Sequence, residues 1–255
     1  MHAAREWLVL IFPAIDLRDG KCVRLRQGDY AQETVFADDP TIMARRWVSQ
    51  GAQWLHLVDL DGAKAGRPIN GGSVQAIVQA AGVPCQVGGG LRNEADIATA
   101  LAWGVARVIV GTKALKSPTW FRSVCERWPE QVVLGIDARD GQVATQGWLE
   151  TSEIAALDLA QRCTGSPLAA LIYTDIGRDG MLAGPNVEAM AAMAAAVTVP
   201  VIASGGVTTL DDIRQLAARG LAGCIVGRAL YEGRIDLTEA LHVAGCGVRT
   251  AAAPR

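Results

Sequence analysis

The sequence has few of the residues that metal, redox and nucleophilic sites require. Its 255 residues include three histidines and six cysteines, and these form no Cys-x-x-Cys pair and no cluster with carboxylates at the spacing of metal ligands. The Gly-x-Gly-x-x-Gly fingerprint of dinucleotide-binding folds is absent, and so is the Gly-x-Ser-x-Gly turn that carries a serine nucleophile. We therefore expect neither a metal nor a cofactor.

Charge and hydropathy exclude two further classes of protein. The formal net charge is −2, which gives no electrostatic reason for binding to nucleic acid or to an anionic membrane. No apolar run approaches the roughly 18 residues of a membrane span, and the short run at residues 7–12 follows no basic region, so we interpret it as a buried strand rather than a signal peptide. The scattered positions of the cysteines indicate reduced thiols in the protein core rather than disulfides. We expect a cytoplasmic monomer.

An internal repeat is the main feature that the sequence does contain. Four blocks of the first half return in the same order in the second, which indicates a duplicated half-domain. We expect one domain over residues 1–245, with halves at about 8–127 and 128–245, followed by a disordered tail at 246–255. The paired blocks are residues 15–20 and 136–141, 57–62 and 173–180, 86–91 and 202–207, and 108–115 and 224–230.

Short apolar runs alternate with longer alanine-rich segments along the chain. The runs are apolar at successive positions, as in parallel strands that are buried on both faces. Segments 93–103 and 208–219 each open with a capping residue and have helical periodicity. Eight strand-then-helix units in two halves predict an α/β fold, a closed (β/α)8 TIM barrel with a twofold internal repeat. The predicted strands lie near residues 8–15, 54–59, 84–88, 107–110, 132–136, 169–174, 199–203 and 223–226.

Two aspartates follow predicted strands that lie on opposite sides of the ring. Active sites of such barrels are built at the C-terminal ends of the strands. Asp16 ends the first strand and Asp137 the fifth, so we expect their carboxylates to face one another across the mouth. We expect a charged loop after the first strand and a long loop after the fifth. Without a metal or nucleophile signature, the remaining chemistry is acid–base catalysis between two carboxylates, which suits an isomerisation.

Glycine-rich turns follow four other strands. A turn of this kind that opens a helix lets backbone N–H groups close on a phosphate, with help from the helix N-terminus. The loops after the seventh and eighth strands form the usual phosphate site of these barrels, and the duplication repeats them after the third and fourth. The pattern predicts a small-molecule ligand with two phosphates. The residues expected to bind them are Gly89, Gly90, Gly111, Thr112, Gly205, Gly206, Gly227 and Arg228.

Four other residues have more ordinary interpretations. Asp59 and Asp175 also follow strands, and we interpret both as caps of the next loop. An isolated histidine within a strand, such as His56, is more often a core residue than a base, although a supporting role beside the site stays open. Trp148, in the long loop, is either an anchor of that loop or a platform for a flat heterocycle. The residues alone do not separate these two roles.

Five motifs span nearly the whole chain. They are Pro-Ala-Ile-Asp-Leu-Arg-Asp-Gly-Lys-Cys-Val-Arg-Leu at 13–25, Leu-His-Leu-Val-Asp-Leu-Asp-Gly-Ala at 55–63, the glycine turn at 88–90, Gly-Trp-Leu-Glu at 147–150 and Asp-Gly-Met-Leu-Ala-Gly-Pro-Asn at 179–186. In combination they strongly resemble HisA, a family of isomerases of histidine biosynthesis whose substrate is ProFAR. The resemblance extends from about residue 10 to about residue 244.

The resemblance implies an Amadori rearrangement of the aminoaldose ProFAR to an aminoketose, without a cofactor. Under it, Asp137 is the general acid that protonates the ribose ring oxygen, and Asp16 is the general base that removes the C2′ proton. The family's substrate carries a phosphate at each end, in agreement with the two glycine cradles. The resemblance also implies a helper role for Asp179 and substrate contacts for Thr174, Arg24 and Trp148, the last by stacking on the imidazole ring.

Two features depart from the family pattern. Residues 1–7 extend beyond its usual start, and we assign them no function. Position 146 is glutamine, whereas dual-substrate isomerases that also act on phosphoribosylanthranilate tend to carry arginine there, which argues against dual activity.

Two other functional classes stay open. The sister cyclase of the same pathway has Cys-Leu-Asp where this chain has Ala14, Ile15 and Asp16, and it lacks the Gly-Trp-x-Glu loop. A non-catalytic phosphosugar-binding barrel has no need of two carboxylates beside a dianionic ligand. Both classes therefore fit the sequence less well than the isomerase does.

Overall fold

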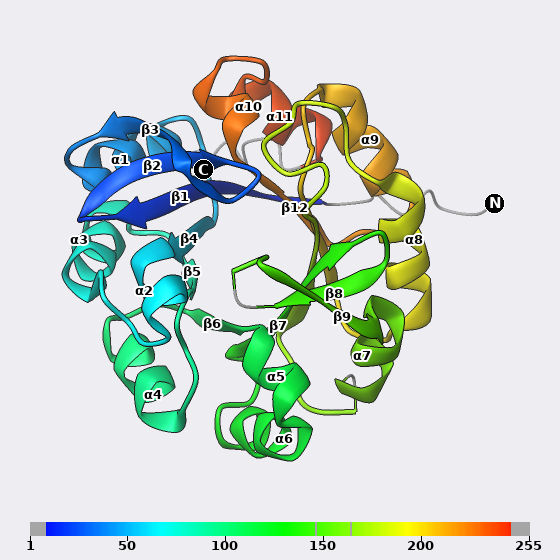
Figure 1. The fold of residues 1–255 in the computed structure, drawn as a ribbon. Helices are drawn as coiled ribbons and strands as arrows, with labels where there is room; N and C mark the ends of the chain where they lie inside the picture. The colour runs from blue at the N-terminus through cyan, green and yellow to red at the C-terminus, as the bar shows by residue number, and fades with distance from the viewer. Residues whose placement is uncertain (1–8, 146, 164, 246–255) are drawn as a thin grey trace, which may run out of the picture.

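The computed structural model describes residues 9–145, 147–163 and 165–245, which form a closed ring of eight barrel strands with helices outside it (Figure 1). Neighbouring strands pair in parallel, and the ring closes where β1 pairs with β12 and β7 with β10. The predicted (β/α)8 barrel and its eight strands are therefore confirmed. The barrel strands are β1 (Leu10–Arg18), β4 (Leu55–Asp59), β5 (Cys85–Gly88), β6 (Arg107–Val110), β7 (Val132–Arg139), β10 (Ala170–Asp175), β11 (Val201–Ser204) and β12 (Gly223–Val226).

The barrel strands are apolar on both faces because each face packs against a different layer. Side chains that point into the barrel form a small inner cluster, which includes Phe12 and Ile172. Side chains on the outer faces, such as Leu57 and Val108, belong to a larger cluster shared with the helices. Apart from His56 and Gln86, which are buried within β4 and β5, the polar side chains of the barrel strands lie at the strand ends, because both faces of each strand are covered. The functional groups of the barrel therefore gather at its mouth.

Capping residues set the start of the two helices that the sequence predicts. The Asn93 side chain accepts a hydrogen bond from the N–H of Asp96 at the start of α4, and Thr209 forms a capping box with Asp212 at the start of α9. The outer helices are α1 (Pro40–Ser49), α3 (Gly71–Ala81), α4 (Glu94–Ala102), α6 (Pro118–Arg127), α7 (Ala156–Cys163), α8 (Val187–Ala196), α9 (Leu210–Ala218) and α11 (Leu237–Val243). Shorter helices follow β4, β6 and β12, namely α2 (Leu60–Ala65), α5 (Thr112–Lys116) and α10 (Arg228–Tyr231).

Two antiparallel ribbons replace the loops expected after the first and fifth barrel strands. β1 continues past Asp16 because β2 (Lys21–Arg26) pairs back onto it, and β3 (Asp29–Ala37) extends that ribbon. β7 pairs in the same way with β8 (Gln142–Thr145), which pairs with β9 (Glu150–Ala155). Figure 1 shows one ribbon in blue and the other in green at opposite sides of the mouth. The expectation of loops at these places is wrong.

A two-residue turn starts each ribbon. Asp19 and Gly20 have φ angles of 48° and 76°, and Asp140 and Gly141 have 51° and 79°. Both residues of each turn are thus left-handed, as in the tight hairpins that Asp-Gly pairs favour. The repeated Asp-Gly pair therefore folds both strand ends back over the mouth.

Some of the sequence predictions concern segments outside the described residues. These are the extension at 1–7, the glutamine at 146 and the tail at 246–255. Within the described ranges, no helix combines the length and apolar character needed to cross a membrane. The five cysteines of those ranges are buried and free of disulfides, as predicted for core thiols.

Candidate active site

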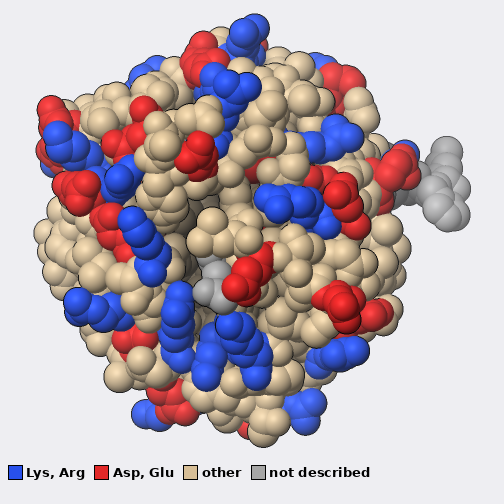
Figure 2. All heavy atoms as spheres, in the orientation of Figure 1, with Lys and Arg blue, Asp and Glu red and all other residues tan. Residues whose placement is uncertain are grey.

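A pocket of about 260 Å³ opens at the mouth of the barrel. Side chains from the ends of the barrel strands line it, together with residues of both ribbons. Figure 2 shows the hollow near the middle of this face, with lysine and arginine side chains along one side of it, over the region of α2, α4 and α5. The pocket is therefore basic at one rim and apolar at its floor, where Ala14, Ile172 and Ile225 lie.

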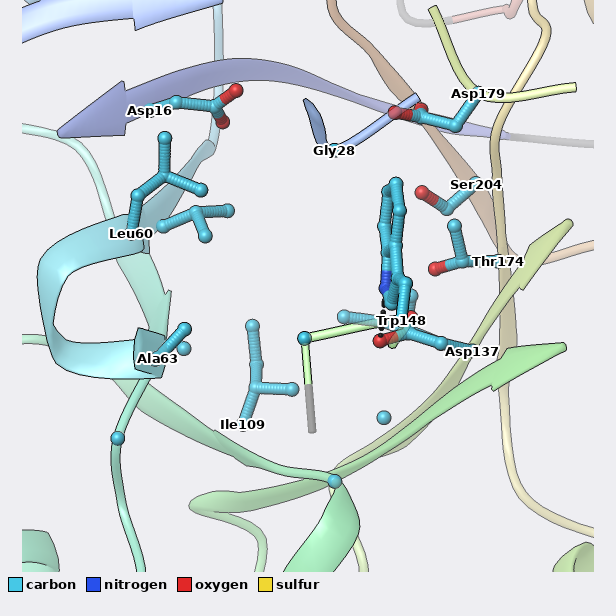
Figure 3. Close-up of a pocket in the computed structure, with 18 of the residues that line it drawn as sticks. Asp16, Gly28, Leu60, Ala63, Ile109, Asp137, Trp148, Thr174, Asp179 and Ser204 are labelled. Carbon is cyan, nitrogen blue, oxygen red and sulfur yellow. Dashed lines mark hydrogen bonds between the residues drawn. The ribbon is translucent and has the colours of Figure 1, made fainter. Parts of the chain in front are cut away.

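Asp16 and Asp137 lie on opposite sides of this pocket, as their strand positions predict (Figure 3). Burial raises the pKa of Asp16 to about 6, although the guanidinium of Arg24 opposes the rise. Burial also raises the pKa of Asp137, and hydrogen bonds from Trp148 and Thr174 oppose that rise. The site thus holds a buried carboxylate, Asp16, which has a cationic partner, and a half-buried one, Asp137, which has neutral donors.

Arg24 reaches the pocket from the ribbon strand β2. Its Nη1 lies 2.9 Å from Oδ2 of Asp16, and both side chains are almost fully buried. A Cβ atom added at Gly227 would lie 2.0 Å from Nη2 of Arg24, so the guanidinium rests directly on the glycine turn after β12. Nε of Arg24 is buried and has no hydrogen-bond partner within the part of the chain that the structure describes. Arg24 therefore joins the carboxylate of Asp16 to the turn predicted to bind phosphate.

Trp148 extends from the second ribbon over Asp137. Its Nε1 donates a hydrogen bond of 2.8 Å to Oδ2 of Asp137 (Figure 3). A Cβ at Gly28, in the turn of the first ribbon, would lie 2.5 Å from the indole ring. The two ribbons therefore meet above the pocket through a glycine and a tryptophan. Of the two roles left open for Trp148, the structure favours the anchor, and stacking on a heterocycle stays a prediction.

Asp179 is a third carboxylate of the pocket, and it is half-buried. It lies in the loop after β10, as predicted, and Figure 3 shows it on the same side as Thr174 and Ser204. Burial raises its pKa and Arg24 opposes the rise. Its charge in turn raises the pKa of Asp16 and of Asp137. Burial and the repulsion between these carboxylates favour retention of a proton by at least one of them.

The two pairs of glycine turns have matching backbone geometry. Gly89 and Gly205 have φ angles of 113° and 91°, and a Cβ at either would lie within 2.5 Å of a backbone oxygen, that of Asp59 or of Asp175. Only glycine fits these turns. Gly90 and Gly206 also have positive φ angles, and each would collide with a backbone oxygen in the same way. The structure thus forms two equivalent glycine cradles from the two halves of the chain.

The second turn of each cradle also matches its counterpart. Gly111 precedes α5 and Gly227 precedes α10 with nearly the same backbone angles, and no side chain of the described residues caps either helix. Thr112 lines the main pocket, and Arg228 lines a smaller adjoining pocket of about 30 Å³. Arg228 donates to the carbonyl of Gly180 at 2.7 Å and also pairs with Glu232.

Basic residues that sequence reasoning missed complete the first cradle. Arg92 and Lys113 line the main pocket beside the turns at Gly90 and Gly111. Their equivalents in the second half, Thr208 and Ala229, carry no charge. A basic residue two positions after each glycine turn was the available signal, because such side chains reach a phosphate bound by the turn. The first cradle takes its cations from these two residues, and the second takes them from Arg24 and Arg228.

The aspartates interpreted as loop caps have that role. Asp59 accepts hydrogen bonds from the N–H groups of Gly62, Ile69 and Asn70. Asp175 accepts from Gly177 and from the amide of Asn186. Both carboxylates are thus occupied by the loops that follow them.

His56 is buried at the pocket floor, where Nδ1 lies 3.1 Å from Nε2 of Gln86. Burial lowers its pKa to about 3, with a further decrease from the charge of Arg24, so the ring is neutral at physiological pH. The prediction of a core position is confirmed.

Comparison with known proteins places the chain close to one group. A family described as "Histidine biosynthesis protein" matches residues 10–236. Relatives named 1-(5-phosphoribosyl)-5-((5-phosphoribosylamino)methylideneamino)imidazole-4-carboxamide isomerase come from several organisms. That of Gloeothece citriformis is 55% identical over 240 residues, which are 93% of each chain. That of Rhodopirellula baltica is 54% identical over 92% of this chain and 94% of its own, and that of Rhodospirillum rubrum is 54% identical over 92% and 99%.

Proposed function

The chain belongs to the histidine biosynthesis protein family, and on that premise we propose that it is the isomerase that converts the aminoaldose ProFAR, the compound after which its relatives are named, to the corresponding aminoketose. The observation that carries this proposal is the pair of carboxylates with raised pKa values, Asp16 and Asp137, on opposite sides of a pocket between two matched glycine cradles. An aminoaldose with a phosphate at each end has the shape and charge that this arrangement fits.

The proposed reaction moves protons only, and the side chains of the site suffice for it. Asp137, protonated, gives its proton to the ribose ring oxygen as the C1′–oxygen bond breaks, which leaves an iminium group. Asp16, ionised, removes the proton from C2′, and the electron pair flows to the iminium nitrogen. Return of a proton to C1′ and loss of the proton from the C2′ hydroxyl give the ketone. No electron leaves or enters the substrate, so the balance requires no oxidant or reductant.

The electrostatics support this division of roles. Arg24 lies 2.9 Å from Asp16 and opposes the effect of burial, so it favours the ionised form that a base needs. Among the described residues, Asp137 receives hydrogen bonds from the neutral donors Trp148 and Thr174 and is not paired with a cation, and the negative charge of Asp179 favours its protonated form. Asp179 thereby serves as the proposed helper. Environments that differ in this way separate an acid from a base within one site.

The cradles support the orientation of the substrate. We assign one phosphate to the turns at Gly89, Gly90, Gly111 and Thr112, and the other to those at Gly205, Gly206, Gly227 and Arg228. Arg92 and Lys113 add charge at the first. Two anchored ends fix the reacting carbons between Asp16 and Asp137, and such orientation can contribute several kcal/mol, up to about 7–11, to lowering the barrier.

The direct test is turnover of ProFAR by the purified full chain in buffer with a chelator and without added cofactor. Formation of the ribulosyl isomer is followed by absorbance and by chromatography, with phosphoribosylanthranilate in a parallel reaction. We expect turnover of ProFAR and none of phosphoribosylanthranilate. Conversion of both would make the enzyme dual in substrate, and tight binding of ProFAR without conversion would contradict the isomerase assignment.

A further inference from the structure

Tyr231 lies behind the second phosphate cradle without lining the pocket. It ends α10, four residues after Gly227, and its side chain is buried among other aromatic rings. The ring of Trp47 meets it edge-on at 5.3 Å between centroids, and that of Phe36 lies at 4.6 Å. The phenol hydroxyl donates a hydrogen bond of 2.8 Å to the carbonyl of Ala14 and lies 3.3 Å from Sγ of Cys22. The proposed mechanism leaves this residue unused.

The hydroxyl and the ring of Tyr231 each contact a residue that is close to Asp16, the proposed base. Ala14 is two residues before Asp16 on β1, so the two side chains are on the same face of the strand. The guanidinium of Arg24, which pairs with Asp16, lies over the phenol ring with its Cζ 5.9 Å from the centroid. Tyr231 therefore contacts the strand that carries Asp16 through its hydroxyl and the partner of Asp16 through its ring.

We propose that Tyr231 is a positioning residue, which holds Arg24 between the phosphate turn at Gly227 and the carboxylate of Asp16 and thereby keeps the base in its working geometry. This role rests on the proposed isomerase function. It adds a structural link between the two parts of the site, because the short helix that starts at the phosphate turn ends at the residue that supports the base.

The geometry leaves few other supports for Arg24. Among the described residues, its Nε has no hydrogen-bond partner, and its Nη2 rests on the bare Cα of Gly227. The ion pair with Asp16 and the face of the Tyr231 ring are therefore the main contacts of the guanidinium, and the charge of Asp179 adds an electrostatic attraction. The phenol itself stays neutral, since burial raises its pKa well above the ordinary value. Its contribution is one of position and not of charge.

Loss of the contact between Tyr231 and Arg24 should change the pKa of Asp16. The groups that act on the Asp16 carboxylate are Arg24 from β2, which lowers its pKa, and Asp179 from the loop after β10, which raises it. Cys22 and Tyr231 are close but uncharged, because burial raises the pKa of the Cys22 thiol to about 11. When Arg24 moves away, burial and Asp179 are less opposed, so the pKa of Asp16 rises. Because the base must be ionised, the fall in activity on the acid side of the pH profile then lies at a higher pH.

The experiment compares Tyr231→Phe, which keeps the ring and removes the hydroxyl, with Tyr231→Leu, which removes both. The control is Tyr173→Phe, at an equally buried tyrosine in the outer cluster. Each protein is assayed with ProFAR between pH 5 and 9, and its folding is checked by circular dichroism. The phosphates of ProFAR titrate in the same range in every assay, so only differences between variants are interpreted.

We expect kcat of Tyr231→Phe to fall about fivefold and that of Tyr231→Leu about tenfold or more, with smaller rises in KM. We expect the acid limb of kcat/KM to move upward by about half a pH unit or more in the leucine variant, less in the phenylalanine variant and not at all in the control. If the leucine variant does not fold, the phenylalanine variant decides the question.

The two proposals fail in different ways. Folded Tyr231 variants with the wild-type kcat and acid limb would overturn the positioning role and leave the isomerase function intact. A wild-type protein that does not convert ProFAR would overturn the isomerase function, and with it the role of Tyr231. A fall in kcat with an unmoved acid limb would reduce Tyr231 to a structural residue and would also overturn the proposal.

Discussion

Trp148 donates its indole N–H to Oδ2 of Asp137 at 2.8 Å, and its backbone has a φ angle of 72°, in the left-handed region that a bulky residue rarely adopts. The ring rests on Gly28 of the other ribbon, where any larger residue would collide with it. Backbone strain of this kind persists only when the surroundings maintain it. The tip of the second ribbon is therefore fixed so that an indole contacts the proposed acid.

This hydrogen bond predicts the effect of Trp148→Phe on the pH dependence of turnover. A donor to a carboxylate favours its ionised form, and the Trp148 contact opposes the rise in the pKa of Asp137. Its removal therefore raises the pKa of Asp137. A general acid must be protonated, so we expect the basic limb of kcat to move to higher pH. The measurement is kcat for ProFAR from pH 6 to 10, with Trp120→Phe in α6 as the control.

The acid limb is a second readout for Trp148→Phe. That limb reports Asp16, which Trp148 does not contact, and we expect it to stay in place. A basic limb at the wild-type position would show that Asp137 is not the acid whose ionisation limits turnover.

Removal of either carboxyl group should abolish most of the activity without loss of binding. We expect Asp16→Asn and Asp137→Asn each to lower kcat by about 10²–10⁴-fold, the usual contribution of a positioned acid or base. The cradles remain, so the dissociation constant of ProFAR, measured by calorimetry, should change little. Asp211→Asn, on the exposed start of α9, is the matched control. Near-normal turnover in Asp16→Asn or Asp137→Asn would contradict the role assigned to the residue that was replaced.

The sequence was sufficient for the barrel because its strands are short, apolar on both faces and repeated in two halves. It was insufficient for the ribbons. β2 and β3 are polar on their outer faces, and the exposed residues of β3 give no burial pattern that marks a strand. The pairs Asp19-Gly20 and Asp140-Gly141 were the usable signal, since Asp-Gly between two strand-forming segments favours a two-residue hairpin.

The site residues at the ends of barrel strands could be predicted from the sequence, whereas the contacts that the ribbons make could not. Asp16 and Asp137 could be placed because the end of a barrel strand fixes the direction in which its last side chains point. The contact between Trp148 and Gly28 joins two ribbons from distant parts of the chain, and no local pattern encodes their meeting. The support of Arg24 by Tyr231 is likewise a contact between residues about 200 positions apart, so it becomes visible only in three dimensions.

Burial of Asp16 predicts a dependence of stability on pH. Its pKa is about 6 in the folded protein, against 3.8 for the ordinary side chain, so folding favours the protonated form. Its stabilising contribution is complete below pH 4 and is lost as the pH rises through 6. Asparagine does not titrate, so Asp16→Asn does not lose stability in this way as the pH rises. We expect the free energy of unfolding of the variant to rise by about 1 kcal/mol relative to wild type between pH 5 and pH 8.

Urea unfolding at a series of pH values measures this difference, and Asp211→Asn again serves as the control. Only the change of the difference with pH is interpreted, because the substitution also changes packing around residue 16 by an amount that does not depend on pH. A constant difference across the range would mean that Asp16 has an ordinary pKa.

The glycine cradles predict that two substitutions of glycine by alanine have unequal effects. Gly205 and Gly220 both have positive φ angles, 91° and 79°, but a Cβ at Gly205 would lie 2.5 Å from the backbone oxygen of Asp175, whereas one at Gly220 has nothing within 4 Å. Gly220→Ala should therefore cost only the left-handed backbone, about 1–2 kcal/mol of unfolding free energy. Gly205→Ala adds a steric clash and should cost about 3 kcal/mol or more.

Kinetics separate the cradle from general stability in the same pair of variants. Gly205→Ala displaces the turn proposed to hold a phosphate, so we expect KM for ProFAR to rise about tenfold or more, which corresponds to about 1.4 kcal/mol of lost binding. Gly220→Ala lies outside the pocket and should keep the wild-type KM at temperatures where it is folded. Because both variants carry the same left-handed backbone, a rise in KM confined to Gly205→Ala comes from the turn displaced by the clash with Asp175 and not from the backbone angle alone. Equal KM values in the two variants would show that this cradle does not bind a phosphate of ProFAR.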